Sequence, residues 1–180
     1  GAGNPQAEDD NYVTSYIWEN VLQKDSLLEI IQKFISFEVK TEKKDGKNVT
    51  KKRLIFPRFH QLDVVRKLIA DVRENGSGKN YLIQHSAGSG KSNSIAWTAY
   101  RLASLHNDPV FTSVVIVTDR RNLDAQLQET ITGFDHTLGS VCAIDEKKSS
   151  KDLRDALNAG KRIIVTTLQK FPVIYEEVDD

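Results

Sequence analysis

The stretch YLIQHSAGSGKS, residues 81–92, decides how the rest of this 180-residue chain is interpreted. It opens with a short apolar run, turns through small residues and ends in Lys91 and Ser92. Apolar residues then recur at positions 95, 99 and 102, a spacing typical of an amphipathic helix. A strand, a glycine-rich turn and a helix in this order predict a phosphate-binding loop.

Two glycines give the turn its expected chemistry. Gly88 and Gly90 let the backbone point N–H groups toward an anion with no Cβ in the way, and Ala87 and Ser89 are the small residues beside them. The helix that follows adds the positive end of its dipole. We therefore expect residues 87–90 to surround the phosphates of a nucleotide.

The two residues that close the stretch are candidates for catalysis. Lys91 is expected to reach the β- and γ-phosphates, and the Ser92 hydroxyl is expected to hold Mg²⁺. The strict motif has glycine six residues before the lysine, where this chain has His85. The alternative interpretation is a flexible turn before a helix. The flanking strand and helix patterns favour the phosphate loop.

Composition narrows the class of protein. The chain has 25 basic and 25 acidic residues, so no net charge attracts it to nucleic acid or to a membrane surface. Its one cysteine, Cys142, excludes an internal disulfide and is typical of a reducing cytoplasm. No apolar run approaches the length of a membrane span. The lack of any methionine suggests a piece of a longer protein.

The residues before the phosphate loop favour helices and one basic segment. Helical spacing of apolar residues runs over 12–34 and again over 57–74. Between them, residues 40–53 hold seven Lys or Arg and two acids, a net charge of +5 (7 − 2). Asp45-Gly46 favours the tip of a hairpin. This segment is either a solvated loop or a sequence-independent phosphate contact.

The residues after the loop alternate between apolar runs and helical patterns. Residues 113–118 and 163–165 contain continuous β-branched runs that suit strands buried on both faces of a parallel sheet. Helical patterns at 122–131 and 149–158 follow or precede them. We expect an α/β fold with a parallel sheet and flanking helices, incomplete and preceded by a short helical segment.

Several motifs in one order carry a family resemblance. PRFHQ precedes HSAGSGKS, and VVIVTDRRNLDAQL and IIVTTLQKF follow it. This order resembles the first RecA-like lobe of superfamily 2 helicases and translocases. QHSAGSGKSNSIAW, together with RFHQLDVV, is most similar to the motor subunit of type I restriction enzymes. The resemblance implies a helical linker with a basic loop at 1–53 and a RecA-like lobe at 54–180.

Roles follow from this resemblance motif by motif. Gln61 matches the glutamine that reads the adenine edge, with Arg58 beside the base, since one amide both donates and accepts. The motifs containing Arg120 and Arg121, and Thr166 and Thr167, match those that touch the DNA backbone. The family implies ATP and Mg²⁺ as cofactors. It implies double-stranded DNA and the modification and specificity subunits of a restriction complex as partners, and a cytoplasmic location.

Some parts of the family pattern have no match in this sequence. The Asp-Glu-Ala-His box that completes Mg²⁺ binding is absent, and Glu176-Glu177 lacks the aspartate that would bind the metal. The expected function is the ATP-binding part of a restriction-enzyme DNA translocase, active in full length and inactive as this piece alone. The alternatives are another superfamily 2 lobe, a small-molecule kinase, or a nucleotide-binding or interaction module without a DNA role.

Overall fold

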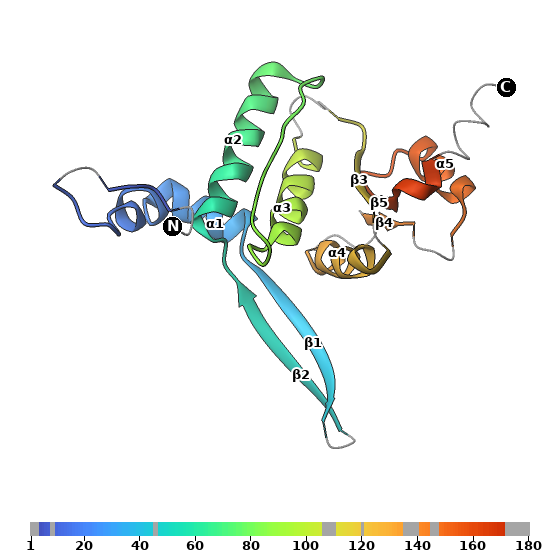
Figure 1. The fold of residues 1–180 in the computed structure, drawn as a ribbon, viewed down its shortest axis with the longest axis horizontal. Coiled ribbons are helices and arrows are strands. Elements are labelled where there is room, and N and C mark those ends of the chain that lie inside the picture. The colour runs from blue at the N-terminus through green and yellow to red at the C-terminus, as the bar shows by residue number, and fades with distance from the viewer. Residues whose placement is uncertain are drawn as a thin grey trace. The chain divides into compact units, whose positions relative to one another are not determined.

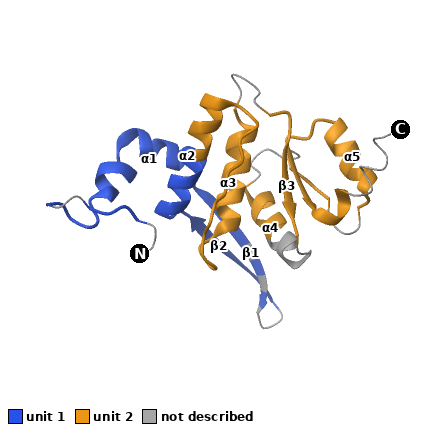
Figure 2. Cartoon of the chain, turned by 45° about the horizontal axis from the view of Figure 1, so that its top comes forward, with its two compact units in different colours: residues 1–67 blue, residues 68–180 orange. Residues whose placement is uncertain are grey.

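The chain forms two compact units, residues 1–67 and residues 68–180, shown in different colours in Figure 2. The computed structural model describes residues 4–7, 10–44, 47–105, 111–119, 121–134, 141–144 and 148–171, with the backbone alone for 40, 42, 44 and 121–126. No helix within these ranges is long and apolar enough to cross a membrane.

Unit 1 combines short helices with a long hairpin. A single π-helical turn, η1 (Ile17–Val21), precedes α1 (Lys24–Lys33). The antiparallel strands β1 (Ser36–Lys44) and β2 (Lys47–Ile55) then run side by side as a two-stranded ribbon (Figure 1). The predicted hairpin is confirmed, but the basic residues form its strands, whereas the sequence pattern had placed them in a loop.

Helix α2 (Phe59–Asn75) begins in unit 1 and ends in unit 2. Its first turns are tied to α1, because the Arg66 guanidinium donates to Glu29 Oε2 at 2.9 Å and to Ser26 Oγ at 2.8 Å. The predicted apolar stripe is confirmed by the burial of Leu62, Val65, Ile69 and Val72. Gly76, with φ of 70°, follows the last helical residue, where a left-handed residue commonly ends a helix.

Unit 2 is built on a three-stranded parallel sheet. β5 (Ile163–Thr167) lies between β3 (Val114–Thr118) and β4 (Val141–Ala143), with the order β3-β5-β4. Both pairings with β5 are parallel, and Val115 stands opposite Ile164. All five residues of β5 are buried. The predicted α/β fold with a parallel sheet is confirmed.

Helices cover both faces of this sheet (Figure 1). α3 (Lys91–Ala103) and α4 (Arg121–Gly133) pack on one face, where Ala96, Ala99, Leu127 and Ile131 contact Ile163 and Val165. α5 (Ser150–Asn158) packs on the other face, where Leu153 and Ala156 contact Ile164. A short 3₁₀ helix, η2 (Leu168–Lys170), follows β5.

The strand predicted to be buried on both faces at residues 113–118 is buried on one face only. Val115 and Val117 are 36% and 44% exposed, whereas Val114 and Ile116 pack against α3 and α4. The register puts Val115 on the same face as Ile164. Among the described residues, the core that α5 makes on this face includes residues of β5 and β4 and none of β3. The prediction was wrong here because a β-branched run does not reveal what covers it.

The strand predicted before the phosphate loop is not formed. Residues 81–83 adopt no regular structure, and Tyr81, Leu82 and Ile83 are 42%, 95% and 43% exposed. A strand is stabilised by hydrogen bonds and side-chain contacts to a neighbouring strand. None of the described strands pairs with this segment. Its apolar residues therefore stay on the surface of unit 2.

Candidate phosphate-binding site

The turn before α3 has the backbone conformation that the sequence predicted. Gly88 and Gly90 have φ of 72° and 84°, in the left-handed region that a side chain disfavours. Gly90 is the N-cap of α3, and its carbonyl accepts from the N–H groups of Asn93 and Ser94 at 3.1 and 3.3 Å. No described side chain caps this helix. No side chain therefore competes with an anion at the start of α3.

Lys91, the first residue of α3, folds back over the turn that precedes it. Its Nζ donates to the backbone carbonyls of His85 at 3.2 Å and Ser86 at 2.8 Å. The ammonium thus lies against the loop, held by two neutral acceptors. A phosphate oxygen is a stronger acceptor for an ammonium than a carbonyl is, so a bound phosphate would replace these contacts.

The remaining small residues of the loop are positioned differently from one another. Ala87 is exposed, Ser89 is buried, and Ser92 is half-buried in the first turn of α3. Ser92 is the second residue of α3, one residue after Lys91, where a metal bound to phosphates would need an oxygen ligand. These are the residues that the sequence predicts for a nucleotide–Mg²⁺ site.

A carboxylate on α2 anchors the segment that leads into the loop. Asp71 accepts from the Tyr81 hydroxyl at 2.5 Å and from Lys79 Nζ at 3.0 Å. The bond from Tyr81, followed by the bond and charge of Lys79, lowers the pKa of Asp71 below its ordinary value. The same bond raises the pKa of Tyr81. We call Asp71, Lys79 and Tyr81 the lead clasp.

Gln61 caps the start of α2. Its Oε1 accepts from the backbone N–H of Arg58 at 2.9 Å, and the side chain is 3% exposed. Gln61 is the third helical residue, so this bond is the half of a capping box in which the third residue reaches back to the N-cap. The amide therefore has a structural partner in addition to the adenine contact predicted for it.

The carboxyl ends of two strands bring together the motifs expected to touch DNA. Thr118 ends β3 opposite Thr167 of β5, and its hydroxyl lies 3.5 Å from the Thr166 carbonyl. Gln169 Nε2 donates to the Asp119 carbonyl at 3.3 Å. Thr166 and Thr167 are buried, at 0% and 6% exposed. A direct contact of either hydroxyl with DNA would therefore need a local rearrangement.

Two predicted DNA-contact residues and one acidic pair fall partly or wholly outside the described residues. Arg120 and the pair Glu176-Glu177 are not described, and Arg121 is described by its backbone alone, as the first residue of α4.

Lys91 and Ser92 lie in α3, which packs directly on β3 and β5. The phosphate loop and the carboxyl ends of these strands thus belong to one packed unit.

Two features of the site were not predicted from the sequence, although the sequence contains a signal for one of them. The cap at Gln61 follows from its place three residues after Arg58 at a helix start, which is the capping-box position. The lead clasp joins residues ten apart across a helix end and an irregular segment. Neither helical nor strand periodicity contains that information.

Comparison with known proteins gives a family match and a relative. The SWI2/SNF2 ATPase family model matches residues 60–179. The type I restriction enzyme HindI endonuclease subunit of Haemophilus influenzae is 29% identical over 161 residues, which are 87% of this chain and 14% of that protein. The chain thus spans about one seventh of that relative. No solved structure matches.

The family match covers the first turns of α2, the lead clasp, the phosphate loop and the whole sheet. The resemblance to type I restriction motor subunits that the motifs indicated is confirmed by the relative. With its parallel sheet, flanking helices and glycine-rich turn before α3, unit 2 has an incomplete RecA-like fold. The chain belongs to the SWI2/SNF2 ATPase family.

Proposed function

We propose that this chain is the ATP-binding part of a motor that moves double-stranded DNA through a type I restriction enzyme. The observation that carries the proposal is the loop before α3. Two glycines in the left-handed conformation leave the first N–H groups of α3 uncapped, and Lys91 lies across the same loop. The family match and the restriction-enzyme relative support the same function.

Each residue of the loop has a distinct part in this proposal. The N–H groups around Gly88 and Gly90 bind the phosphate oxygens, and Lys91 exchanges its two carbonyl partners for the β- and γ-phosphates. Ser92 supplies one oxygen to Mg²⁺, which when bound offsets the charge on the phosphates. Ala87 and Ser89 keep the turn small. Arg58 and Gln61 contribute the adenine contact that the family resemblance implies.

The DNA contacts belong to the carboxyl ends of the sheet strands. Arg120 and Arg121 follow β3, and Thr166 and Thr167 end β5. In the proposal, these segments hold the DNA backbone while ATP binding moves one lobe against another. Residues 1–53 are the linker that precedes this lobe, and residues 54–180 are the lobe itself. The modification and specificity subunits are the partners of the whole motor, and the cytoplasm is its location.

The 180 residues are proposed to bind ATP without hydrolysing it. The sequence has no Asp-Glu-Ala-His box, so Ser92 would lack an acidic partner at the metal. An arginine finger in related chemistry accelerates phosphoryl transfer by about 10³–10⁵. No residue of this chain is assigned that role.

Nucleotide binding by a Lys91→Ala variant tests the phosphate loop. A charge-assisted bond to phosphate contributes about 1.5–3 kcal/mol, so ATP affinity should fall at least about tenfold in calorimetry. Lys151→Ala, which removes an exposed lysine from α5, is the matched control and should bind normally. Equal ATP affinity in the two variants would refute the phosphate-loop assignment.

A Gln61→Glu variant tests the adenine contact separately from the cap. Glutamate can still accept from the Arg58 N–H and so keeps the cap on α2. It cannot donate to adenine as an amide does. The expected result is a lower ratio of ATP to GTP affinity with an unchanged circular dichroism spectrum. If the ratio stays constant, Gln61 serves as a cap alone, and the module binds phosphate without reading the base.

A further inference from the structure

The hairpin of unit 1 has two faces of different charge. The register of β1 and β2 alternates the residues between them. One face carries both acidic residues of the strands, Glu38 and Glu42, and its base is covered, since Ser36 is 3% exposed. The other face carries no acidic residue. The acid-bearing face also carries Lys47, Lys51 and Arg53, but a polyanion docked there would meet carboxylates, and on the other face it meets none.

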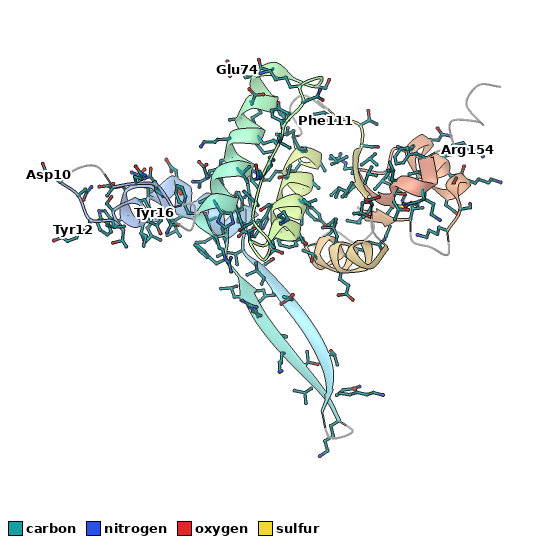
Figure 3. All side chains as sticks on the ribbon, viewed as in Figure 1. Asp10, Tyr12, Tyr16, Glu74, Phe111 and Arg154 are labelled. Carbon is teal, nitrogen blue, oxygen red and sulfur yellow. The ribbon has the colours of Figure 1, made fainter. Side chains whose placement is uncertain are left out.

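The acid-free face is exposed from its base to its tip. Its residues, all exposed, are Phe37, Val39, Thr41 and Lys43 of β1 and Asn48, Thr50, Lys52 and Leu54 of β2. The half nearer the tip is entirely polar, and Figure 3 shows side chains standing out along the ribbon. We call Thr41, Lys43, Asn48, Thr50 and Lys52 the distal face. It combines two ammonium groups with hydroxyl and amide groups.

The register fixes the distance between the two lysines of the distal face. Lys43 stands opposite Asn48, and Lys52 lies four residues further along β2. At about 3.4 Å per residue, the two lysine positions are about 14 Å apart along the ribbon. The Thr41 and Thr50 hydroxyls lie between them, 3.3 Å from each other. Two cations therefore flank a neutral polar centre.

The two strands of the hairpin give it little stability without a partner. An isolated two-stranded hairpin is marginally stable in water. A partner bound along the exposed face would therefore add contacts that stabilise the ribbon.

We infer that the distal face docks on double-stranded DNA, with the ribbon lying in the major groove and Lys43 and Lys52 on the flanking phosphates. The major groove, about 12 Å wide, admits a two-stranded ribbon. Lys43 lies on β1 and Lys52 on β2, so each lysine faces the phosphates of one groove wall. Thr41, Asn48 and Thr50 face the groove floor. This inference rests on the proposed function, and it adds a DNA contact in unit 1, outside the RecA-like sheet.

The test measures binding of the 180-residue chain to a mixed-sequence 20-base-pair duplex at several salt concentrations. Each phosphate contact contributes about −0.9 to the slope of log affinity against log salt. Lys43→Gln/Lys52→Gln should make the slope shallower by about 1.8. The wild type should lose about tenfold more affinity than this variant between 50 and 200 mM salt.

Two matched variants carry the same change of charge elsewhere. Lys47→Gln/Arg53→Gln alters the acid-bearing face of the hairpin, and Lys151→Gln/Lys161→Gln alters exposed residues of unit 2 at and beyond α5. Both should keep the wild-type slope. Equal losses in all three variants would show a diffuse effect of net charge and would overturn the inference. A shallower slope only in the Lys47→Gln/Arg53→Gln variant would also overturn the inference. An unchanged slope in the distal-face variant would do the same.

Two further measurements separate this inference from the proposed function. A single strand of the same length should bind more weakly than the duplex, and equal binding would overturn the placement in a groove. ATP affinity, measured on the same samples, should not respond to the distal-face substitutions. Normal ATP binding with no duplex binding at low salt would reject the hairpin contact alone. Duplex binding without any ATP affinity would reject the nucleotide site alone.

Discussion

Two apolar runs of unit 2 have similar sequences and different structures. Residues 81–83 read Tyr-Leu-Ile and residues 163–165 read Ile-Ile-Val. The second run forms the central strand β5, where Ile164 is 0% exposed. The first run forms no strand, and Leu82 is 95% exposed. An apolar run becomes a strand where neighbours pair with it and cover it, and composition does not decide this.

The two runs are held by different kinds of interaction. β5 pairs with β3 and β4 and lies between helices on both faces, so its position rests on hydrophobic burial and a hydrogen-bonded ladder. Residues 81–83 are anchored through one side chain, by the bond from Tyr81 to Asp71 in the lead clasp. Substitutions in β5 should therefore lower the stability of unit 2 as a whole. Substitutions at residues 81–83 should affect only that segment.

Truncation of one leucine and one isoleucine should give the largest contrast. Ile164→Ala removes a buried side chain from the core under α5 and should lower the free energy of unfolding by about 2–5 kcal/mol. Leu82→Ala removes an exposed side chain and should change it by less than about 0.5 kcal/mol. The measurement is urea unfolding followed by the fluorescence of Trp97, in a background where the exposed Trp18 is replaced by Phe.

Comparable losses from the two truncations would contradict the comparison. They would show that residues 81–83 are buried in solution against a partner strand. The background substitution is itself a check, because Trp18 is 49% exposed and belongs to unit 1. Its replacement should leave the unfolding of unit 2 unchanged.

Loss of the cap of α5 should lower the free energy of unfolding less than truncation of Ile164 does. Ser149 Oγ accepts from the Asp152 N–H, and Asp152 Oδ2 accepts from the Ser149 N–H at 2.6 Å. α5 covers Ile164 through Leu153 and Ala156. Ser149→Ala should therefore lower the free energy of unfolding by about 0.5–2 kcal/mol. Ser150→Ala, one residue inside the helix, is the control and should have little effect.

The contribution of this cap should depend on pH in one direction. Hydrogen bonds from the backbone and side chain of Ser149 lower the pKa of Asp152 below its ordinary value of 3.8. A group with a lowered folded-state pKa stabilises the fold above its unfolded pKa and loses that effect as the pH falls through the folded one. Alanine keeps the bond from the backbone N–H, so at this carboxylate the two proteins differ only in the bond from the Ser149 hydroxyl. The difference between wild type and Ser149→Ala should thus shrink as the pH falls below 3.8. A difference that stays constant through the titration of Asp152 would show that the Ser149 hydroxyl makes no bond to that carboxylate.

The sequence predicted those parts of the molecule that depend on local chemistry. Gly88, Gly90 and Lys91 lie where the motif placed them, because the turn and the helix start depend on residues next to each other. Val115 and Val117 were expected to be buried and are exposed, because their burial depends on an element far away in the chain. The prediction of a strand at residues 81–83 was wrong for the same reason. The role of Gln61 as a cap could be predicted from its position three residues after Arg58. The family resemblance instead predicted a contact with adenine.

The smallest predicted effect is confined to the lead clasp. Asp71→Asn keeps the size of the side chain but removes the charge that holds Lys79 and Tyr81. The free energy of unfolding should not change measurably, since the group is fully exposed. Amide hydrogen exchange at residues 79–85 should become faster. Tyr81→Phe, which leaves the Lys79 ion pair, should speed up exchange less.

The pKa values of the clasp give a direct measurement of its presence in solution. The bond to Asp71 raises the pKa of Tyr81 above its ordinary value of 10.0, and the same bond, followed by that from Lys79, lowers the pKa of Asp71 below 3.8. The clasp is fully present between these ordinary values. It is lost as the pH falls through the lowered pKa of Asp71 or rises through the raised pKa of Tyr81. In NMR titrations with labelled tyrosine, Tyr81 should ionise at a higher pH in wild type than in Asp71→Asn. If both proteins titrate alike, residues 81–83 are not anchored to α2, and the segment before the phosphate loop is free to pair with another strand.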